Sequence, residues 1–297
     1  GGSRYPHPMK TVLECIQSGA KYLRDRGVDG ARRNMEWLVA RQMECSRIEL
    51  YTQFDRPMSE TELEPLRDLL KRRSLGEPLQ HLLGTVEFCG REFLCDQRAL
   101  VPRPETEELI EEVLKLEFPR PARVLDMGTG SGVIGITVAL ALAEDCRETV
   151  LSDISADALG LARENAEKHD LAPSLLQSDL FTEVEGTFDL IVANLPYVAD
   201  GERELLSREV SHDPDLALFA GPGGLDAFQR FFPAVPAHLV PGGWVALEIG
   251  ANQGQQVTSL AQTCGFESIC LGNDLSGNPR FVFARAAGHD EDNPAPL

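Results

Sequence analysis

From Arg123 onward, short apolar segments alternate with longer helical ones, and this alternation constrains the fold more than any other feature of the chain. The strand candidates are Arg123–Asp126, Thr149–Asp153, Ser174–Asp179, Phe188–Asn194, Gly243–Glu248, Glu267–Leu271 and Arg280–Ala284. The helix candidates are Gly132–Leu142, Asp157–His169, Leu225–His238 and Gln253–Cys264. The pattern predicts an α/β fold, in which a mostly parallel sheet is covered by helices on both faces.

One of these strands carries the strongest functional signal. Leu190–Ala193 is a continuous apolar run, as expected of a strand buried on both faces. The run ends abruptly in Asn194, Leu195, Pro196 and Tyr197. Ligands of open α/β sheets bind beyond the carboxyl ends of the strands, so an amide, a backbone carbonyl and an aromatic ring stand at the expected site of chemistry. Such a set of groups can hold a planar –NH2 group.

The first part of the chain has a different pattern and predicts a small helical domain over residues 9–85. Apolar residues recur at helical spacing in Met9–Arg26. Asp29 is the expected cap of a second helix. Ser59–Glu62 has the form of a capping box and predicts the start of a third helix.

A connector over residues 86–106 is predicted to link this domain to the α/β domain, which we expect over residues 107–287. Weak alternation around Cys89 and Gly90 indicates a β-hairpin. Two prolines make Val101–Thr106 a stiff extended segment, and a helix is expected to follow over Glu107–Leu116. Residues 1–8 are expected to be a tag or disordered, and the polar, proline-containing tail at 288–297 is expected to be disordered.

Acidic side chains are concentrated in the second part of the chain. The whole chain carries 28 basic and 47 acidic side chains, a net charge of −19. Residues 1–100 hold 16 of the basic and 15 of the acidic side chains. The remaining residues therefore hold 12 basic and 32 acidic side chains, a net charge of −20. Such an acidic surface is poorly suited to a polyanion. The charge therefore weighs against a nucleic-acid substrate, although a local basic patch would still permit one.

The seven cysteines are scattered and form no C-x-x-C pair, and the six histidines have no metal-binding spacing. This usage predicts a reducing, cytoplasmic compartment with neither a disulfide framework nor a zinc site. No apolar run approaches the ~20 residues that a transmembrane helix needs, so no membrane association is expected.

A glycine-rich turn follows the first strand of the α/β part. The residues expected to contact a cofactor there are Asp126, Gly128, Thr129, Gly130 and Gly132. Glycines let a backbone approach a ligand closely, but dinucleotide-binding folds use a similar loop. Here the acid at the strand end would repel a phosphate and favour a cationic group. S-adenosylmethionine carries an ammonium and a sulfonium, and no phosphate.

Two further strands end in acids. Asp153 is suited to accept hydrogen bonds from two ribose hydroxyls. Asp179 can accept from an adenine amino group, with Leu180 as an apolar neighbour of the ring. Asn194, on the adjoining strand, is expected to reach the same cofactor. Acids at three successive strand ends are far more specific than any one of them, and they predict a methyltransferase cofactor site.

These residues, with motifs elsewhere, carry a resemblance to a known family. The motifs are Gly76–Gln80, Val101–Thr106, Asp126–Gly132, Asn194–Tyr197, Leu216–Leu218, Gly223–Asp226 and Asn278–Phe281. The chain resembles, over nearly its whole length from about Met9, the glutamine N5-methyltransferases that modify peptide chain release factors, the PrmC/HemK family.

The resemblance implies a fold and a substrate. It implies a Rossmann-like class I methyltransferase domain of seven strands, preceded by a helical-bundle domain that docks the release factor and by a β-hairpin linker. The methyl acceptor would be the side-chain amide of the glutamine in the Gly-Gly-Gln motif of class I release factors. The family usually has Asn-Pro-Pro-Tyr where this chain has Leu195 at the second position. Leucine keeps the backbone carbonyl and loses the φ restraint of proline.

Catalytic and substrate-binding roles are assigned to the strand-ending segment. Asn194 can accept one N–H of the substrate amide and the Leu195 carbonyl the other, while Tyr197 packs flat on the amide. Pro196 belongs to the same turn. Arg103 is expected to position the substrate or the linker, with a structural ion pair as the alternative.

Some alternatives remain open at this stage. An adenine N6-methyltransferase acting on rRNA or DNA would hold a planar amino group in the same way. A ribosomal-protein glutamine methyltransferase and a non-catalytic binding module that kept the fold are the others. Glu248, at the end of the fifth strand, is either a supporting residue of the site or a solvated one. The expected partner is a release factor, without stable nucleic acid, and the expected state is a monomer.

Overall fold

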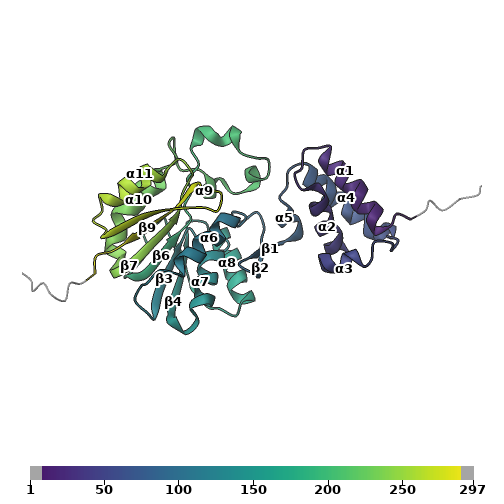
Figure 1. Cartoon of the computed structure of the whole chain (residues 1–297). Helices are drawn as coiled ribbons and strands as arrows, with labels where there is room; N and C mark the ends of the chain where they lie inside the picture. Colours follow the sequence, from purple (N-terminus) through teal and green to yellow (C-terminus); the bar gives the residue numbers. More distant parts are fainter. Residues whose placement is uncertain (1–8, 289–297) are drawn as a thin grey trace, which may run out of the picture. The chain divides into compact units, whose positions relative to one another are not determined.

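The computed structural model describes residues 9–288 of the 297-residue chain. The tag or disorder predicted for residues 1–8 lies outside the described residues, as does the disorder predicted for 288–297 except at its first residue. The chain groups into two compact units. The first, the helical unit, contains the residues up to Thr85 together with Ser207–His212. The second, the α/β unit, contains Val86–Leu206 and the residues from Asp213 onward. Figure 1 labels the elements of each unit.

The helical unit is a bundle with its own apolar core. Its helices are α1 (Val12–Arg24), α2 (Ala31–Gln42), α3 (Arg47–Tyr51), α4 (Glu60–Ser74) and α5 (Leu79–Leu83). The predicted capping box at the start of α4 is confirmed, since the Ser59 backbone N–H donates to the Glu62 carboxylate at 2.8 Å. The predicted cap of α2 was wrong by one residue. Gly30, with a φ of 61°, is the residue that precedes the helix, and Asp29 lies outside it.

Arg73 explains why the segment Ser207–His212 groups with the helices. Its side chain is buried, donates to Asn34 Oδ1 at 2.6 Å and forms an ion pair with Glu209. Nothing in the sequence indicated this grouping, because the partners are more than a hundred residues apart and have no local spacing.

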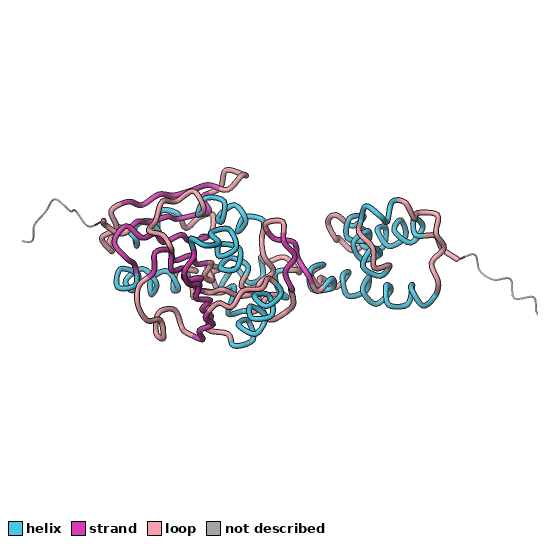
Figure 2. Tube along the Cα trace, turned by 90° about the horizontal axis from the view of Figure 1, so that it is seen from below, coloured by secondary structure: helices cyan, strands magenta, loops and turns pink. Residues whose placement is uncertain are grey.

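A seven-stranded sheet forms the centre of the α/β unit, in the order β5-β4-β3-β6-β7-β9-β8. The strands are β3 (Ala122–Met127), β4 (Cys146–Asp153), β5 (Ser174–Gln177), β6 (Phe188–Ala193), β7 (Leu239–Glu248), β8 (Ser268–Asn273) and β9 (Pro279–Arg285). Strand β9 is antiparallel to both of its neighbours, and the other pairings are parallel. All seven strand predictions, and the mostly parallel sheet, are confirmed. Figure 2 shows the strands running side by side through the unit.

Helices cover both faces of this sheet (Figure 1). From Pro104 onward, the helices of the chain are α6 (Pro104–Val113), α7 (Val133–Leu142), α8 (Ala156–Lys168), α9 (Asp215–Leu218), α10 (Asp226–Ala234) and α11 (Gly254–Gln262), and 3-10 turns lie at Ala143–Asp145, Asp200–Leu205, Val210–His212 and Val235–His238. The turn at Val210–His212 belongs to the helical unit by its contacts. Helices α6, α7 and α8 pack on one face and α10 and α11 on the other, as the two separate apolar cores show.

Strand β6 is buried on both faces, as predicted, because all six of its residues are buried. Leu190 and Val192 belong to the core under α6, α7 and α8. Ile191 and Ala193 belong to the core under α10 and α11. Alternate side chains of a strand point to opposite faces, so an uninterrupted apolar run is what this central position requires.

The connector contains the predicted hairpin, formed by β1 (Thr85–Phe88) and β2 (Arg91–Leu94). The helix after it begins at Pro104, three residues earlier than predicted. Proline lacks an N–H and has a fixed φ, which suits the first turn of a helix as well as an extended segment. The connector is therefore extended only up to Arg103.

Asn165 joins the hairpin to the glycine-rich loop that follows β3. This fully buried residue of α8 accepts from the Leu94 N–H at 2.6 Å and donates to the Leu94 carbonyl at 3.1 Å. It also donates to the Ser131 carbonyl at 2.9 Å. A single side chain thus satisfies two backbone groups of strand β2 and one of the glycine-rich loop, which the sequence did not reveal.

Replacing Asn165 by alanine should destabilise the α/β unit by roughly 2–4 kcal/mol, because buried backbone groups would lose their partner. The measurement is urea unfolding followed by the fluorescence of Trp244 in a Trp37→Phe background, since these are the two tryptophans of the chain. Asn273→Ala, at an exposed position, is the matched control and should change the stability by less than about 0.5 kcal/mol. Equal effects of the two substitutions would contradict the role of Asn165.

Candidate active site

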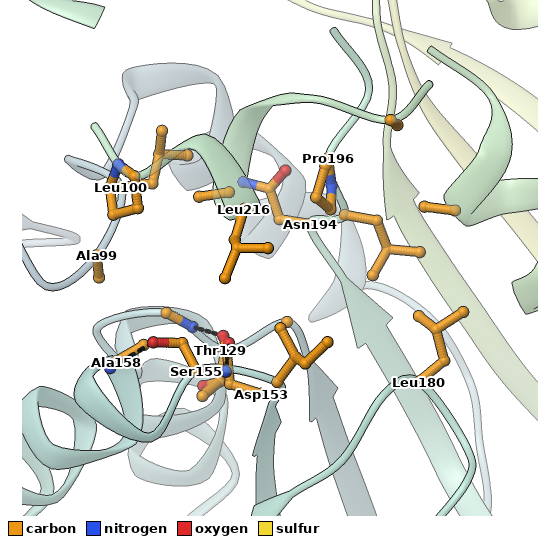
Figure 3. Close-up of a pocket in the computed structure, with 18 of the residues that line it drawn as sticks. Ala99, Leu100, Thr129, Asp153, Ser155, Ala158, Leu180, Asn194, Pro196 and Leu216 are labelled. Atoms are coloured by element: carbon orange, nitrogen blue, oxygen red, sulfur yellow. Dashed lines mark hydrogen bonds between the residues drawn. The ribbon is translucent and has the colours of Figure 1, made fainter. Parts of the chain in front are cut away.

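A cavity of about 340 Å³ lies at the carboxyl ends of β3, β4, β5 and β6. This is the edge at which open α/β sheets bind ligands. The strand ends contribute Gly128–Ser131, Asp153–Ser155, Ser178–Leu180 and Asn194–Pro196 to its wall. The rest of the wall comes from residues 98–100, Pro102, Thr106, Val133, Ile134, Ala158, Pro214, residues 216–217, 219–221 and 226–227, and Arg230. In Figure 3, Thr129, Asp153 and Ser155 lie on one side of the cavity, and Asn194, Pro196 and Leu216 lie on the other.

Most of the residues that the sequence selected do line this cavity. They are Gly128, Thr129, Gly130, Asp153, Asp179, Leu180, Asn194, Leu195 and Pro196. Four others do not: Asp126, Gly132, Tyr197 and Arg103. The structure gives each of the four a place behind or beside the wall.

Two glycines of the loop after β3 have different tasks. Gly128 has a φ of +68°, and an added Cβ would lie 3.3 Å from the Asn194 carbonyl oxygen. The position therefore requires glycine on both conformational and steric grounds. At Gly132, with a φ of +86°, an added Cβ would lie 3.1 Å from the Ala162 Cβ. Gly132 thus allows the loop to pack against α8. It was predicted to contact a cofactor, but it does not line the cavity.

Asp126 lies beneath the loop, although the sequence predicted that it would face the cofactor. Its carboxylate is fully buried and accepts from the Thr129 hydroxyl at 2.6 Å and from the Gly135 N–H at 2.8 Å. Its other oxygen has no hydrogen-bond partner among the described residues. Burial raises the pKa of Asp126 to about 6, against the effect of these hydrogen bonds. Asp126 therefore fixes the shape of the loop from below.

Asp153 faces the cavity, as Figure 3 shows. One oxygen accepts from the Gly130 N–H at 2.9 Å, and the other accepts from the Ser155 N–H at 2.9 Å. Burial raises the pKa of this carboxyl, while the backbone donors oppose the shift. Each carboxylate oxygen has a further lone pair, so the group can still accept from a ligand.

Asp179 also lines the cavity, and it is paired with Arg230 of α10 at 2.7 Å. Both side chains are about half exposed. The sequence did not identify Arg230, because it lies 51 residues after Asp179 and no local spacing links the two. Leu180 also lies on the cavity wall (Figure 3).

The strand-ending segment places its four residues in different surroundings. Asn194 and Pro196 line the cavity, and no described residue forms a hydrogen bond with the Asn194 side-chain amide. Leu195 is buried, and its side chain would lie 3.4 Å from a Cβ added to Gly128. Tyr197 does not reach the wall. Its hydroxyl donates to Glu248 Oε1 at 3.2 Å.

Arg103 is held away from the cavity by an ion pair. It donates to the buried carboxylate of Asp213 at 2.6 Å, and Asp213 also accepts from the Val101 N–H at 3.1 Å. The structural ion pair that the sequence left open for Arg103 is therefore present. The predicted role of Arg103 toward a substrate stays a prediction.

The sheet order with an antiparallel β9 between β7 and β8, the glycine-rich loop after β3 and the acid at the end of β4 define a class I methyltransferase. A solved methyltransferase from Pyrococcus furiosus shares the fold, with a TM-score of 0.51, 19% identity and coverage of 67% of this chain and 90% of that one. No helix among residues 9–288 is long and apolar enough to cross a membrane.

Comparison with known families narrows the class. Residues 14–84 match the model of the PrmC N-terminal domain, and residues 106–212 match the model of the methyltransferase small domain. A release factor glutamine methyltransferase of Geobacter sulfurreducens is 39% identical over 93% of this chain and 96% of its own. The enzyme of the same name from Koribacter versatilis is 36% identical over 93% of this chain and 98% of its own. The one from Deinococcus radiodurans is 41% identical over 74% of this chain and 79% of its own. The chain belongs to the family of release factor glutamine methyltransferases, and it is an enzyme.

The buried Asp126 makes the stability of the α/β unit depend on pH. In the unfolded chain its pKa is near 3.8, and in the folded chain it is about 6. The fold therefore favours the protonated carboxyl of Asp126. Its contribution to the free energy of unfolding is fully present below about pH 3.8 and is lost as the pH rises through about 6. We expect the unfolding free energy of the wild type, relative to Asp126→Asn, to fall by about 3 kcal/mol between about pH 4 and about pH 7.5.

The measurement is urea unfolding of both proteins across this pH range. Asp170→Asn, the same chemical change at an exposed position, is the matched control. A difference between the wild type and Asp126→Asn that did not change with pH would show that the carboxyl titrates at its ordinary pKa.

Proposed function

We propose that this enzyme transfers the methyl group of S-adenosylmethionine to the side-chain amide nitrogen of the glutamine in the Gly-Gly-Gln motif of class I peptide chain release factors. The names of the relatives support a release factor glutamine as the acceptor. The observation that carries the proposal is the position of Asn194, whose amide forms no hydrogen bond within residues 9–288 and lies on the cavity wall opposite Asp153 (Figure 3).

The chemistry of the cavity wall fits S-adenosylmethionine better than a phosphate-containing cofactor. The basic side chains of the described wall are Arg98 and Arg230. Both are engaged, Arg98 with Asp96 and Glu164 and Arg230 with Asp179. Asp153 offers acceptor lone pairs for ribose hydroxyls, and Asp179 with Leu180 suits the adenine end. When bound, the sulfonium supplies an electrophilic methyl carbon.

The residues of the chain would orient the acceptor amide. A carboxamide nitrogen is a weak nucleophile because its lone pair is delocalised into the carbonyl. The Asn194 side-chain oxygen would accept one N–H and the Leu195 carbonyl the other. Both acceptors gain strength as positive charge develops on the nitrogen, so they favour the transition state over the ground state. Orientation of this kind supplies several kcal/mol of barrier reduction. No strong base is needed before methyl transfer, because the proton becomes acidic afterwards.

The roles proposed for the other residues follow from their positions. Gly128, Thr129 and Gly130 would form the cofactor cradle, with Asp126 and Gly132 supporting it from outside. Tyr197 would stand beside the acceptor. In this proposal, the helical unit over residues 9–85 docks the release factor, and the 86–106 connector leads into the methyltransferase unit over residues 107–287.

The acidic character of the chain after residue 100 supports a protein acceptor over a nucleic acid. Release factors act on ribosomes, so we propose a cytoplasmic enzyme. The seven free cysteines agree with a reducing compartment. We propose that the enzyme works as a monomer.

Mass spectrometry of tryptic peptides tests the proposal directly. Incubation of the enzyme, S-adenosylmethionine and a class I release factor should add one methyl group to the glutamine of the Gly-Gly-Gln peptide. A release factor with Gly-Gly-Ala is the control and should stay unmodified. Equal labelling of both, or labelling of a ribosomal-protein glutamine or an adenine of rRNA or DNA in their place, would reject this acceptor.

Two substitutions on opposite sides of the cavity should separate cofactor binding from methyl transfer. Asp153→Ala should weaken S-adenosylmethionine binding by at least about ten-fold, because it removes acceptors for the ribose hydroxyls. Asn194→Ala should lower kcat by about 100-fold, because the acceptor amide loses its orientation. It should change the cofactor Kd by less than about threefold. Calorimetry and steady-state kinetics measure the two effects, and the reverse pattern would contradict these assignments.

A further inference from the structure

A buried carboxylate lies directly behind Tyr197. Glu248 is the last residue of β7 and is 2% exposed. One of its oxygens accepts from the Tyr197 hydroxyl at 3.2 Å, and the other accepts from the Thr106 hydroxyl at 2.7 Å. Ala193 of β6 pairs with Leu247, so Glu248 comes level with Asn194 in the parallel register. The carboxylate therefore stands beside the strand-ending segment.

Three sequence segments that are far apart meet at this carboxylate. Thr106 comes from the first turn of α6, and Glu248 comes from the end of β7. Phe281 of β9 pairs with Glu248, and the preceding Arg280 donates to the Ile249 carbonyl at 3.4 Å. Burial raises the pKa of Glu248, while the hydrogen bonds from Thr106 and Tyr197 and the positive charge of Arg280 act against this shift.

This carboxylate is not a residue that packing alone would select. A buried charge costs several kcal/mol of desolvation, and an apolar side chain of the same volume is often neutral or stabilising in its place. Both oxygens of Glu248 are occupied by hydroxyl donors, as an ionised carboxylate requires. One of these donors, Thr106, lies on the wall of the cavity, and the other is Tyr197.

The backbone of Tyr197 is fixed independently of Glu248. Its carbonyl accepts from Gln253 Nε2 at 2.9 Å, and the same amide group donates to the Gly224 carbonyl at 3.1 Å. Glu248 is thus the contact that fixes the far end of the ring.

We propose that Glu248 is a positioning residue: it holds the ring of Tyr197, which lies outside the cavity wall, and through it keeps Asn194 and Pro196 in place on that wall. Thr106 in turn holds the carboxylate. The inference rests on the proposed function for the identity of the acceptor. It goes further in assigning a role to Glu248 and Thr106, which do not touch the reacting atoms.

An NMR measurement tests the positioning without any acceptor. The chain has four tyrosines, so 3-fluorotyrosine labelling gives few 19F resonances. The resonance of Tyr197 is the one that disappears in Tyr197→Phe. In Glu248→Gln this resonance should shift and broaden as the ring gains freedom. In Glu167→Gln, an exposed control on α8 with the same chemical change, it should stay in place. An unchanged resonance in Glu248→Gln would overturn the proposal.

The kinetic consequence is tested by a double-mutant cycle. Glu248→Gln should lower kcat by about ten-fold, as expected for the loss of a hydrogen bond to a charged acceptor, and should leave the cofactor Kd within about twofold. In the Tyr197→Phe background, the same substitution should lower kcat by less than about twofold, because the hydroxyl through which it acts is absent. Equal decreases of kcat in the two backgrounds would mean that Glu248 acts independently of Tyr197 and would overturn the inference.

A second pair of variants serves if Glu248→Gln does not fold. Thr106→Val removes the other donor and should shift the Tyr197 resonance, while Thr106→Ser keeps the hydroxyl and should not. Equal spectra for the valine and serine variants would contradict the proposal. If the wild type methylates no release factor, the proposed function is wrong, and the NMR comparison still decides whether Glu248 positions Tyr197.

Discussion

The rest of the α/β unit depends on the burial of β6 on both faces of the sheet. Its side chains alternate between two apolar cores, so the strand can neither slip by one residue nor move out of the centre without exposing both sets. Asn194, the residue that directly follows the strand, is consequently fixed at the carboxyl edge beside the glycine-rich loop of β3. The proposed acceptor-binding group thus takes its position from the most constrained strand of the structure.

Three carboxylates near this edge of the sheet differ in burial and in hydrogen-bond donors, and these differences give them different roles. Asp126 is buried beneath the loop and accepts from Thr129 and Gly135, which shapes the cradle. Asp153 also accepts from backbone groups, yet it faces the cavity and keeps lone pairs for a ligand. Glu248 is buried on the far side of Tyr197. The same chemical group therefore supports the loop, faces the proposed cofactor or orients an aromatic ring according to its depth and its donors.

The sequence predicted what local periodicity can encode and missed what tertiary contacts decide. The strands and the capping box of α4 follow from spacing and from residues three apart, so their positions were predicted to within a few residues. The direction in which Asp126 points depends on Thr129 and Gly135, three and nine residues away, which reach it only because the glycine-rich loop folds over it. The partner of Arg103 lies 110 residues away and leaves no local pattern. The sequence consequently predicted which residues lie close together more reliably than it predicted their individual orientations.

Leu195 shows how the family's usual proline can be replaced without freeing the segment. Proline would restrain φ through its ring, and leucine lacks that restraint. In this structure the leucine side chain is 3% exposed and belongs to the core under α10 and α11. Full burial of such a side chain is worth roughly 1.5–3 kcal/mol, which is comparable to the cost of fixing one residue's backbone. The segment therefore obtains from packing the rigidity that the ring would give, and its carbonyl remains in place for the role proposed for it.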